Sequence, residues 1–222
     1  MLKLIIGNKA YSSWSLRGWL AVKQSGLPFE EITVPMFGEE WDKAQQGDEF
    51  APSGGKVPIL WDGDTVVWDS LAIIDYLADK TERTRFWPSD DAARGMARSM
   101  AAEMHSSFPA LRREHSMNVR KIFPPRPLVP EVREEIERIM ELWAQARARF
   151  AGTGDFLFGD WCAADIMYAP VVTRFVSYSI ALPPFAQAYA RAVLEHPHVR
   201  EWIDAAQDEP WVIEKYEVAA TA

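Results

Sequence analysis

Two adjacent serines stand where the N-terminus of a helix could hold an anion. Ser12 and Ser13 lie in the stretch Tyr11–Ser15, immediately before an amphipathic segment. Their hydroxyls could simply cap that helix. A helix N-terminus also presents free N–H groups and a partial positive charge, which stabilise an anion such as a thiolate. On these residues alone, helix capping and thiolate binding are equal alternatives.

A proline follows Val57 near the start of an apolar run, in the stretch Gly55–Leu60. Pro58 cannot donate a hydrogen bond to a neighbouring strand, so its position indicates a sheet edge or a cis turn. A cis bond would leave the backbone of Val57 exposed, where it could pair with an extended peptide. The residues themselves favour an ordinary trans proline at a sheet edge.

A third candidate is the pair Asp69 and Ser70, which opens a helix. Capping of that helix would explain both residues fully. In the functional alternative, the Ser70 hydroxyl and the helix N–H groups receive a carboxylate, while Asp69 meets an ammonium group.

The single cysteine, Cys162, occupies the serine or threonine position of a capping box that ends at Asp165. We interpret it as structural rather than as a reactive thiol at a helix N-terminus. The chain lacks Cys-x-x-Cys, which argues against disulfide exchange, and it lacks Gly-x-Gly-x-x-Gly and Walker-type loops. Its four histidines show no zinc-site spacing, so no metal is expected.

The elements that must position these residues divide the chain in two. The first part alternates strands and helices in the order βαβ followed by ββα. Gly26 is expected to cap a helix C-terminus, and Asp62-Gly63 predicts a hairpin turn. The predicted strands are 2–6, 29–34, 57–60 and 65–68, and the predicted helices are 12–24 and one from about residue 70.

The second part is helical throughout. Residues 81–90 are polar and contain Pro88, which is typical of a linker. A long helix is expected from Asp91, and Pro109 should kink or end it. Its apolar face is predicted to carry Met96, Met100, Met104, Phe108 and Leu111. Further helices are predicted near 130–150, 163–176, 185–195 and 199–206.

Composition narrows the class of protein. Hydrophobic residues make up 48% of the 222 positions, enough for a globular core. The formal net charge of -8 argues against general nucleic-acid binding. No apolar run approaches the roughly 20 residues that span a bilayer. The apolar run at the N-terminus is too short for a signal peptide, so we expect a cytoplasmic protein.

Together these features resemble the glutathione S-transferase superfamily over essentially the whole chain. Three matches in order carry the resemblance: a serine before the first helix, Val57-Pro58 before the third strand, and an acidic residue with Ser70 after the fourth. The stretch 159–170 resembles the family's folding motif in the second domain, and 197–202 resembles a helix start near its C-terminus. The segment 12–17 resembles the zeta-class pattern Ser-Ser-Cys-Ser-x-Arg, with Trp14 in place of the cysteine.

The resemblance implies an α/β, thioredoxin-like N-terminal domain over 1–80, a linker over 81–90 and an all-α domain over 91–222. It implies a cytosolic homodimer with glutathione as co-substrate. Ser12 would hydrogen-bond the glutathione sulfur and Ser13 would assist. The remaining glutathione-binding residues would be Lys56, Val57 with a cis Pro58 that frees its backbone, Asp69 and Ser70.

The acceptor site is expected on the first long helix of the second domain, which faces the glutathione sulfur in the family. Met104 and Phe108 would line it, unless their apolar stripe packs entirely into the helical core. Arg112 or Arg120 would anchor a carboxylate of the acceptor, unless these arginines only form a solvated basic face.

The expected mechanism is activation of the glutathione thiol for attack on a small electrophile. A free thiol has a pKa of about 8.5, and a hydroxyl donor with helix N–H groups favours its anion. One alternative is a glutathione-dependent cis–trans isomerase of the maleylacetoacetate isomerase type, in which the adduct is transient. Another is a protein that binds glutathione or other ligands without catalysis.

Overall fold

A computed structural model describes residues 1–217 of the protein. The first part of the chain forms a four-stranded sheet in the order β2-β1-β3-β4. Strand β1 runs parallel to β2 and antiparallel to β3, which is antiparallel to β4. Its elements are β1 (Leu2–Ile6), α1 (Ser13–Ser25), β2 (Phe29–Thr33), α2 (Glu39–Gln45), β3 (Ile59–Asp62), β4 (Thr65–Trp68) and α3 (Ser70–Lys80). The predicted βαβ–ββα order and thioredoxin-like class are confirmed.

Local chemistry fixes where these elements begin and end. Ser12 caps α1, and Gly26 ends it in the left-handed conformation, with φ of 71°. Strand β3 begins at Ile59, two residues later than the sequence predicts. The reason is Pro58, which has no N–H to donate, so the sheet hydrogen bonds start after it. The Val57-Pro58 bond is cis, as the resemblance implies.

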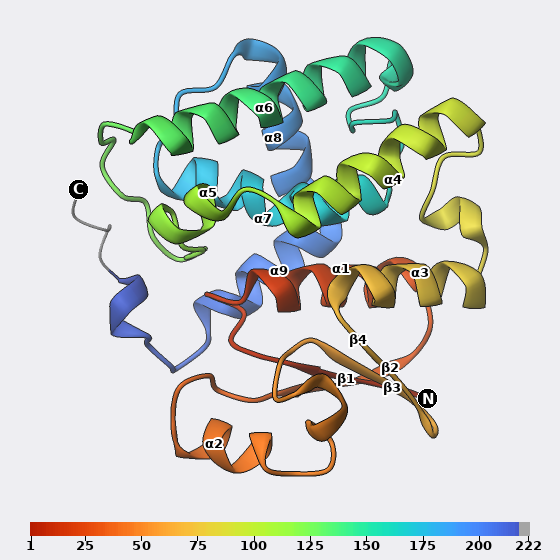
Figure 1. The fold of residues 1–222 in the computed structure, drawn as a ribbon, viewed down its shortest axis with the longest axis vertical. Helices are drawn as coiled ribbons and strands as arrows, with labels where there is room; N and C mark the ends of the chain where they lie inside the picture. The colour runs from red at the N-terminus through yellow and green to blue at the C-terminus, as the bar shows by residue number, and fades with distance from the viewer. Residues whose placement is uncertain (218–222) are drawn as a thin grey trace.

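The second part is all-helical, as predicted. Its helices are α4 (Asp91–Ser106), α5 (Pro109–Glu114), α6 (Pro130–Ala146), α7 (Ala163–Ser177), α8 (Pro184–Glu195) and α9 (Pro197–Gln207). In Figure 1, α1 and α3 lie between the sheet and this helical half, while α2 lies on the far side of the sheet. Helix α7 is buried along nearly its whole length and packs against both α1 and α4.

The long apolar face predicted from Asp91 is divided. Helix α4 ends at Ser106, and Pro109 opens a separate helix, α5. Phe108 lies between them in the left-handed conformation, with φ of 62°. A residue before proline is disfavoured in the helical region, whereas proline is well tolerated at the first position of a helix. Phe108 and Leu111 therefore do not belong to α4.

The structural interpretation of Cys162 agrees with the geometry. Its N–H donates to Asp165 Oδ2 at 2.9 Å, and Asp165 Oδ1 accepts from the Leu157 N–H at 3.1 Å and the Tyr189 hydroxyl at 3.0 Å. The thiol is buried, and burial raises its pKa well above the ordinary value. A thiol held in its neutral form is a poor nucleophile.

The segment between the two parts is anchored rather than loose. Residues 83–85 form a short 3₁₀ helix, and the next two side chains, Phe86 and Trp87, are buried. The Phe86 carbonyl accepts from the Ala163 N–H at the start of α7.

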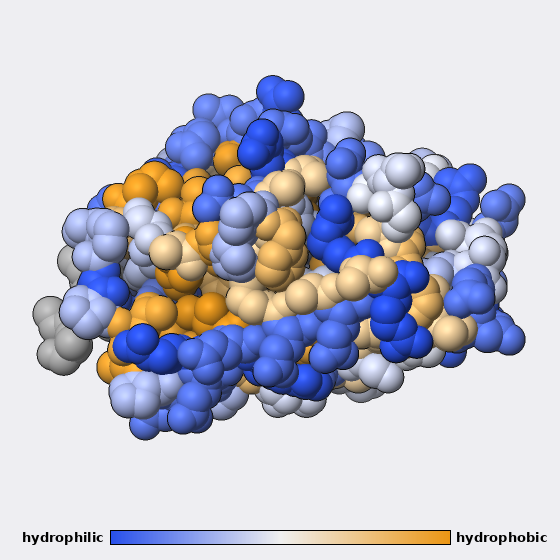
Figure 2. Space-filling view, turned by 90° about the horizontal axis from the view of Figure 1, so that it is seen from above, coloured by the Kyte–Doolittle hydropathy of each residue, from blue (hydrophilic) through white to orange (hydrophobic). Residues whose placement is uncertain are grey.

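Within residues 1–217, no helix is long and apolar enough to cross a bilayer. In the view from above, hydrophobic residues gather between hydrophilic margins (Figure 2).

Candidate functional site

The cleft between the two halves consists of two pockets that share a wall. The larger, here called the proline cleft, has a volume of about 780 Å³ and contains Lys56, Val57, Pro58, Asp69, Ser70 and His105. The smaller, the arginine pocket, has a volume of about 300 Å³ and contains Tyr11, Ser13, Arg112, Ser116, Met117, Arg174 and Tyr216. Ser12, Trp14, Met36 and Phe37 line both.

Ser12 lies at the junction of the two pockets. Its Oγ accepts from the Ser15 N–H at 3.3 Å, which caps α1, and lies 2.8 Å from Ser15 Oγ. Ser15 Oγ in turn accepts from the Gly7 N–H at 2.9 Å, which fixes it beneath Ser12. The backbone at Ser12 is extended, so its side chain faces the cleft while α1 begins behind it. Capping and ligand contact are thus compatible at one residue.

Ser13 lines the arginine pocket but not the proline cleft. Its Oγ accepts a hydrogen bond of 3.1 Å from Nη2 of Arg174, which comes from α7 in the helical half. A hydroxyl oxygen that accepts in this way keeps its own proton free to donate elsewhere. The two serines therefore face different neighbours, although they are adjacent in the chain.

Val57 presents free backbone to the proline cleft. Neither its N–H nor its C=O has a hydrogen-bond partner in the described part of the chain. Lys56 is exposed, and its own N–H donates to Ser53 Oγ at 3.0 Å. Pro58 packs so closely on α1 that a Cβ added to Gly18 would lie 2.7 Å from Pro58 Cγ. This contact positions the turn against the N-terminal half of α1.

Asp69 and Ser70 open α3 at the other side of the proline cleft. Asp69 has a φ of 74°, and its Oδ1 accepts from the Leu71 N–H at 2.8 Å. Its Oδ2 lies 3.3 Å from His105 Nε2, which joins α3 to α4. The Ser70 side chain is buried, and its hydroxyl has no partner among residues 1–217.

The structure places the proposed acceptor residues differently from one another. Met104 and Phe108 line neither pocket, because their side chains pack into the hydrophobic core, which corrects that prediction. Arg120 lines neither pocket, because its guanidinium donates to the carbonyls of Glu209 and Trp211. Arg112 does line the arginine pocket.

Two arginines have positions to which the sequence analysis assigned no role, although Arg17 ends the Ser-Ser-x-Ser-x-Arg pattern. Arg17 is fully buried in α1 and donates through Nε to the Met167 carbonyl at 2.9 Å. Arg174 is 4% exposed and reaches Ser13 from the middle of α7. A signal existed for Arg174, since it is the one charged residue within the mostly apolar run 166–176. Only the fold reveals what it faces.

The segment that follows α9 closes one side of the arginine pocket. Tyr216 lines that pocket, and Lys215 Nζ lies 3.6 Å from the centre of the Phe37 ring. The Tyr11 hydroxyl donates to Glu217 Oε1 at 2.5 Å and accepts from Arg120 Nη2 at 2.5 Å. Burial and the bond to Glu217 raise the pKa of Tyr11. Its hydroxyl is therefore hydrogen-bonded to Glu217, in the segment after α9, rather than available to a ligand in the cleft.

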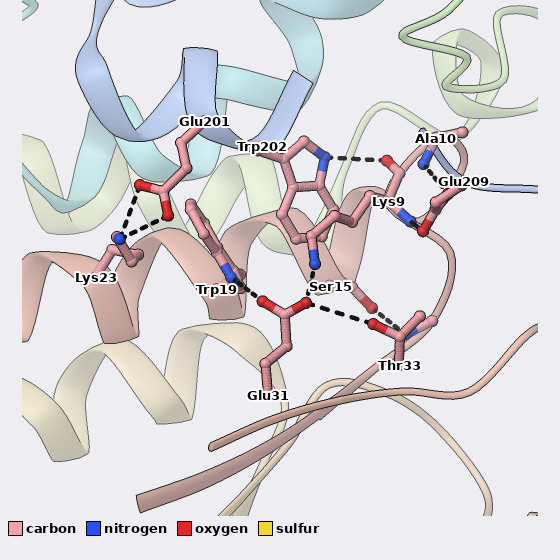
Figure 3. A network of polar contacts seen from close by, with 11 residues as sticks. Lys9, Ala10, Ser15, Trp19, Lys23, Glu31, Thr33, Glu201, Trp202 and Glu209 are labelled. Carbon is pink, nitrogen blue, oxygen red and sulfur yellow. Dashed lines mark hydrogen bonds and ion pairs between the residues drawn. The ribbon is translucent and has the colours of Figure 1, made fainter. Parts of the chain in front are cut away.

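A polar network fixes the loop that leads into Ser12 (Figure 3). The Glu209 carboxylate accepts from the N–H groups of Lys9 and Ala10 at 2.6 and 3.0 Å. Trp202 Nε1 donates to the Lys9 carbonyl at 3.0 Å. Glu31 pairs with the Lys9 ammonium and accepts from Trp19 Nε1. The N-terminus of α1 is thus held from both halves of the molecule.

Other features of the described residues lie apart from this cleft. A hollow of about 580 Å³ between α7 and α8 shares no residue with either pocket. No group of three or more His, Cys, Asp or Glu side chains within residues 1–217 could hold a metal ion.

Comparison with known proteins gives a consistent result. The family models for the N-terminal and C-terminal domains of glutathione S-transferase match residues 11–80 and 126–205. A zeta-class glutathione S-transferase from Euphorbia esula is 28% identical over 178 residues, which cover 74% of this chain and 74% of the relative.

Solved structures share the fold. A glutathione transferase homologue from Burkholderia, crystallised with bound glutathione, superposes with a TM-score of 0.70 at 22% identity and covers 94% of this chain and 99% of its own. A theta-class glutathione S-transferase from Xanthomonas axonopodis pv. citri, also with glutathione bound, gives a TM-score of 0.65 at 20% identity and covers 91% and 96%.

Proposed function

Because the chain belongs to the glutathione S-transferase family, we propose that it binds glutathione in the proline cleft and activates the thiol for attack on an electrophile in the arginine pocket. The observation that carries this proposal is the position of Ser12. It stands at the N-terminus of α1, on the wall that the two pockets share. A sulfur held there is within reach of ligands in both.

The groups of the proline cleft match the parts of glutathione. The unpaired backbone of Val57 can exchange hydrogen bonds with the cysteinyl unit. The unpartnered Ser70 hydroxyl and the free N–H groups of α3 can receive the γ-glutamyl carboxylate. Asp69, whose side chain is 41% exposed, can meet the γ-glutamyl ammonium, and the exposed Lys56 can meet the glycyl carboxylate.

Ser12 and the N-terminus of α1 stabilise the thiolate. The hydroxyl donates to the sulfur anion, and the partial positive charge of the helix end adds to the effect. For this donation, the Ser12 proton turns to the sulfur and Ser15 Oγ donates its own proton to Ser12. Lowering the thiol pKa from about 8.5 by one unit takes about 1.4 kcal/mol, a magnitude that these interactions can supply.

The reaction follows from the nucleophile. The thiol loses its proton to solvent water, the sulfur lone pair forms a bond to the electrophilic carbon, and the leaving group departs with its electron pair. If the acceptor has a conjugated double bond, the π electrons move onto its activating group and a proton completes the addition. Serine is not assigned as the nucleophile, because among residues 1–217 the Ser12 hydroxyl is hydrogen-bonded only to Ser15 and not to a histidine that could accept its proton.

Two other functions belong to the same site. The Ser-Ser-x-Ser-x-Arg pattern and the similarity to a zeta-class relative favour a glutathione-dependent cis–trans isomerase, in which the adduct forms and then breaks. Trp14 in the place of the zeta-class cysteine separates the chain from that pattern. The third candidate is a protein that binds glutathione or other ligands without turnover.

Homodimer formation and a cytoplasmic location are part of the proposal. The single buried thiol of Cys162 suits a reducing compartment. Sedimentation equilibrium tests the dimer: a species of 25.2 kDa at micromolar concentration contradicts it.

The deciding experiment combines binding with turnover. Millimolar glutathione should raise the melting temperature in a concentration-dependent way, because it binds the folded state. A panel of electrophiles, with a maleylacetoacetate-type substrate included, then separates conjugation from isomerisation. A melting temperature that does not respond to glutathione refutes the proposal, and binding without turnover of any substrate favours the non-catalytic function.

A further inference from the structure

Three arginine side chains converge around Trp14 and Ser13, at the N-terminus of α1. Arg17 from α1 and Arg112 from α5 both stack on the Trp14 ring, with guanidinium carbons 4.9 and 4.8 Å from its centre. Arg174 from α7 reaches the neighbouring Ser13 hydroxyl at 3.1 Å. We call these three residues the arginine cluster. Its members come from both halves of the molecule and meet only in the fold.

The arginine cluster lacks acidic partners. Within residues 1–217, none of its three guanidinium groups forms an ion pair with a carboxylate. The carboxylates that act on the cluster from further away are committed elsewhere. Asp69 caps α3 and pairs with His105, and Glu135 accepts from the N–H groups of Ala110 and Leu111.

Such an arrangement opposes folding in the absence of an anion. Burial, with repulsion from Arg112, lowers the pKa of Arg174 to about 9, which still leaves it protonated at neutral pH. Burial and the other two arginines also lower the pKa of Arg17, whose Nη1 and Nη2 atoms have no partner in the described part of the chain. Uncompensated buried charge is costly, and a bound anion offsets that cost.

The arginine pocket is built to receive such an anion. Arg112 and Arg174 line it, together with the hydroxyls of Ser13 and Ser116. Its other side chains include Met36, Met117, Phe37 and Tyr216, which are apolar or aromatic. Planar guanidinium groups recognise carboxylates by two parallel hydrogen bonds. A volume of about 300 Å³ is small and suits an acceptor with a single ring or a short chain.

We propose that the acceptor substrate carries a carboxylate, which Arg174 and Arg112 bind in the arginine pocket while its electrophilic carbon faces Ser12. This inference rests on the proposed transferase function and adds the chemical class of its second substrate. It replaces Arg120 with Arg174 as an anchor and keeps Arg112. Arg17 supports the site from behind, since it adds positive potential without lining the pocket.

A matched pair of acceptors isolates the charge. In 4-chloro-3,5-dinitrobenzoate, the carboxylate lies opposite the carbon that bears chlorine, and 4-chloro-3,5-dinitrobenzamide has nearly the same shape without the charge. Glutathione thiolate adds to the chlorine-bearing carbon, the electron pair passes to the nitro groups, and chloride leaves with the electrons of the broken bond. Each rate is divided by its uncatalysed rate with glutathione, which removes the difference in intrinsic reactivity.

The test compares kcat/KM for the two acceptors in the intact protein. We expect wild type to favour the benzoate by about tenfold, and Arg174→Gln to remove most of that preference. Arg112→Gln should also reduce it, because Arg112 lines the same pocket. Both guanidinium groups donate to backbone carbonyls as well, Arg112 to Met104 and Ser107, and Arg174 to His115 and Pro170. Arg174→Lys keeps the charge and should retain part of the preference. Arg113→Gln is the control, since Arg113 is exposed and pairs with Glu114.

The outcomes are separable. Conjugation of both acceptors with an unchanged ratio in Arg174→Gln and Arg112→Gln refutes the anion site and leaves the transferase function standing. An equal loss with both acceptors also refutes it, since the cluster then acts on the thiolate alone. If Arg174→Gln does not fold, Arg112→Gln and Arg174→Lys decide.

Binding without turnover is measured by calorimetry with 3,5-dinitrobenzoate and 3,5-dinitrobenzamide, which lack the leaving group. Preferential binding of the benzoate that depends on Arg174, in a protein that conjugates neither chlorinated acceptor, supports the anion site and contradicts the transferase function. Equal binding of both compounds by a protein that also conjugates neither refutes the two proposals together.

Discussion

The two pockets of the cleft are built on different principles. The proline cleft relies on backbone groups and short side chains at positions such as Val57 and Ser70, and all of its lining residues except His105 come from the N-terminal half. The arginine pocket relies on long charged side chains from distant elements, notably Arg112 and Arg174. A site made from helix starts and turns leaves a local sequence pattern, since those features have their own residue preferences. A site made from side chains that meet across a domain boundary leaves almost none.

The largest expected effect is at the junction of the pockets. Ser12→Ala should lower kcat by about 100-fold, the loss typical of removing one donor to a developing or stabilised anion, while glutathione affinity changes little. Steady-state kinetics with saturating glutathione and the ultraviolet absorbance of bound thiolate measure it. Ser13→Ala is the matched variant, and if it causes the greater loss, the thiol contact lies on the arginine-pocket side.

The next effect concerns the turn that shapes the proline cleft. Gly18→Ala would bring a Cβ to 2.7 Å from Pro58 Cγ, so overpacking should lower the free energy of unfolding by about 2 kcal/mol. Urea denaturation measures it. Gly95→Ala is the control, because its added Cβ meets nothing within 4 Å in helix α4 and should be neutral or stabilising. Equal free energies of unfolding for the two variants would show that the turn at Pro58 moves away from α1 to accommodate the added Cβ.

A smaller effect separates the two pockets by ligand. Ser70→Ala should weaken glutathione binding by about tenfold, as expected for loss of a hydrogen bond to a charged group, and leave kcat nearly unchanged. Ser116→Ala, in the arginine pocket, should leave glutathione affinity unchanged. Calorimetric titration with glutathione measures both. Reversed effects would mean that the assignment of glutathione to the proline cleft is wrong.

The smallest expected effect is a pH dependence of the free energy of unfolding, which arises from the buried side chain of His115. Burial and the nearby Arg126 lower the pKa of His115 to about 4, and neither ring nitrogen has a partner within residues 1–217. The unfolded chain takes up this proton below about pH 6.5 and the folded chain does not, so stability falls as pH decreases from there toward 4.

His115→Phe removes this contribution, so its unfolding free energy should fall by about 1 kcal/mol less than that of wild type between pH 7 and 5.5. The opposite contribution of Asp165, whose pKa burial raises to about 6, is present in both proteins and cancels. Parallel pH profiles of wild type and variant, followed by urea midpoints, would show that His115 takes up its proton without cost.

Most of the fold could be predicted from the sequence because its signals are local, whereas the residues that line the proline cleft were grouped only through the resemblance to the family. Gly26, Asp62-Gly63 and the serine before α1 each specify a cap or a turn through their own backbone preferences. The expected break at Pro109 is confirmed, but Phe108 and Leu111 were assigned to the face of α4 because the apolar stripe continues through them in the sequence. Met104 and Phe108 were assigned to a ligand because periodicity identifies an apolar face but not what covers it.

Two arginines show most clearly what could not be predicted from the sequence. Arg120 and Arg174 are both basic residues in the helical half, and the sequence drew attention to Arg120 because other basic residues lie near it. In the folded protein, Arg120 donates to the Glu209 carbonyl in the segment after α9, whereas Arg174 donates to Ser13. That outcome depends on where α7 crosses α1, a tertiary contact that no local pattern encodes.

The hydrogen bonds of Glu209 and Trp202 to the Lys9–Ala10 loop have a consequence for how the molecule unfolds. A connection through residues 81–90 alone would let each half melt in its own transition. Here Trp202 in α9 and Glu209 after it bind the loop that precedes α1, so the two halves are linked at both ends of the helical part. Unfolding of one half breaks contacts that order the other, and the loop that leads into Ser12 lies on that shared boundary. Thermal melting should therefore occur as one cooperative event, with activity lost at the same temperature as the global fold.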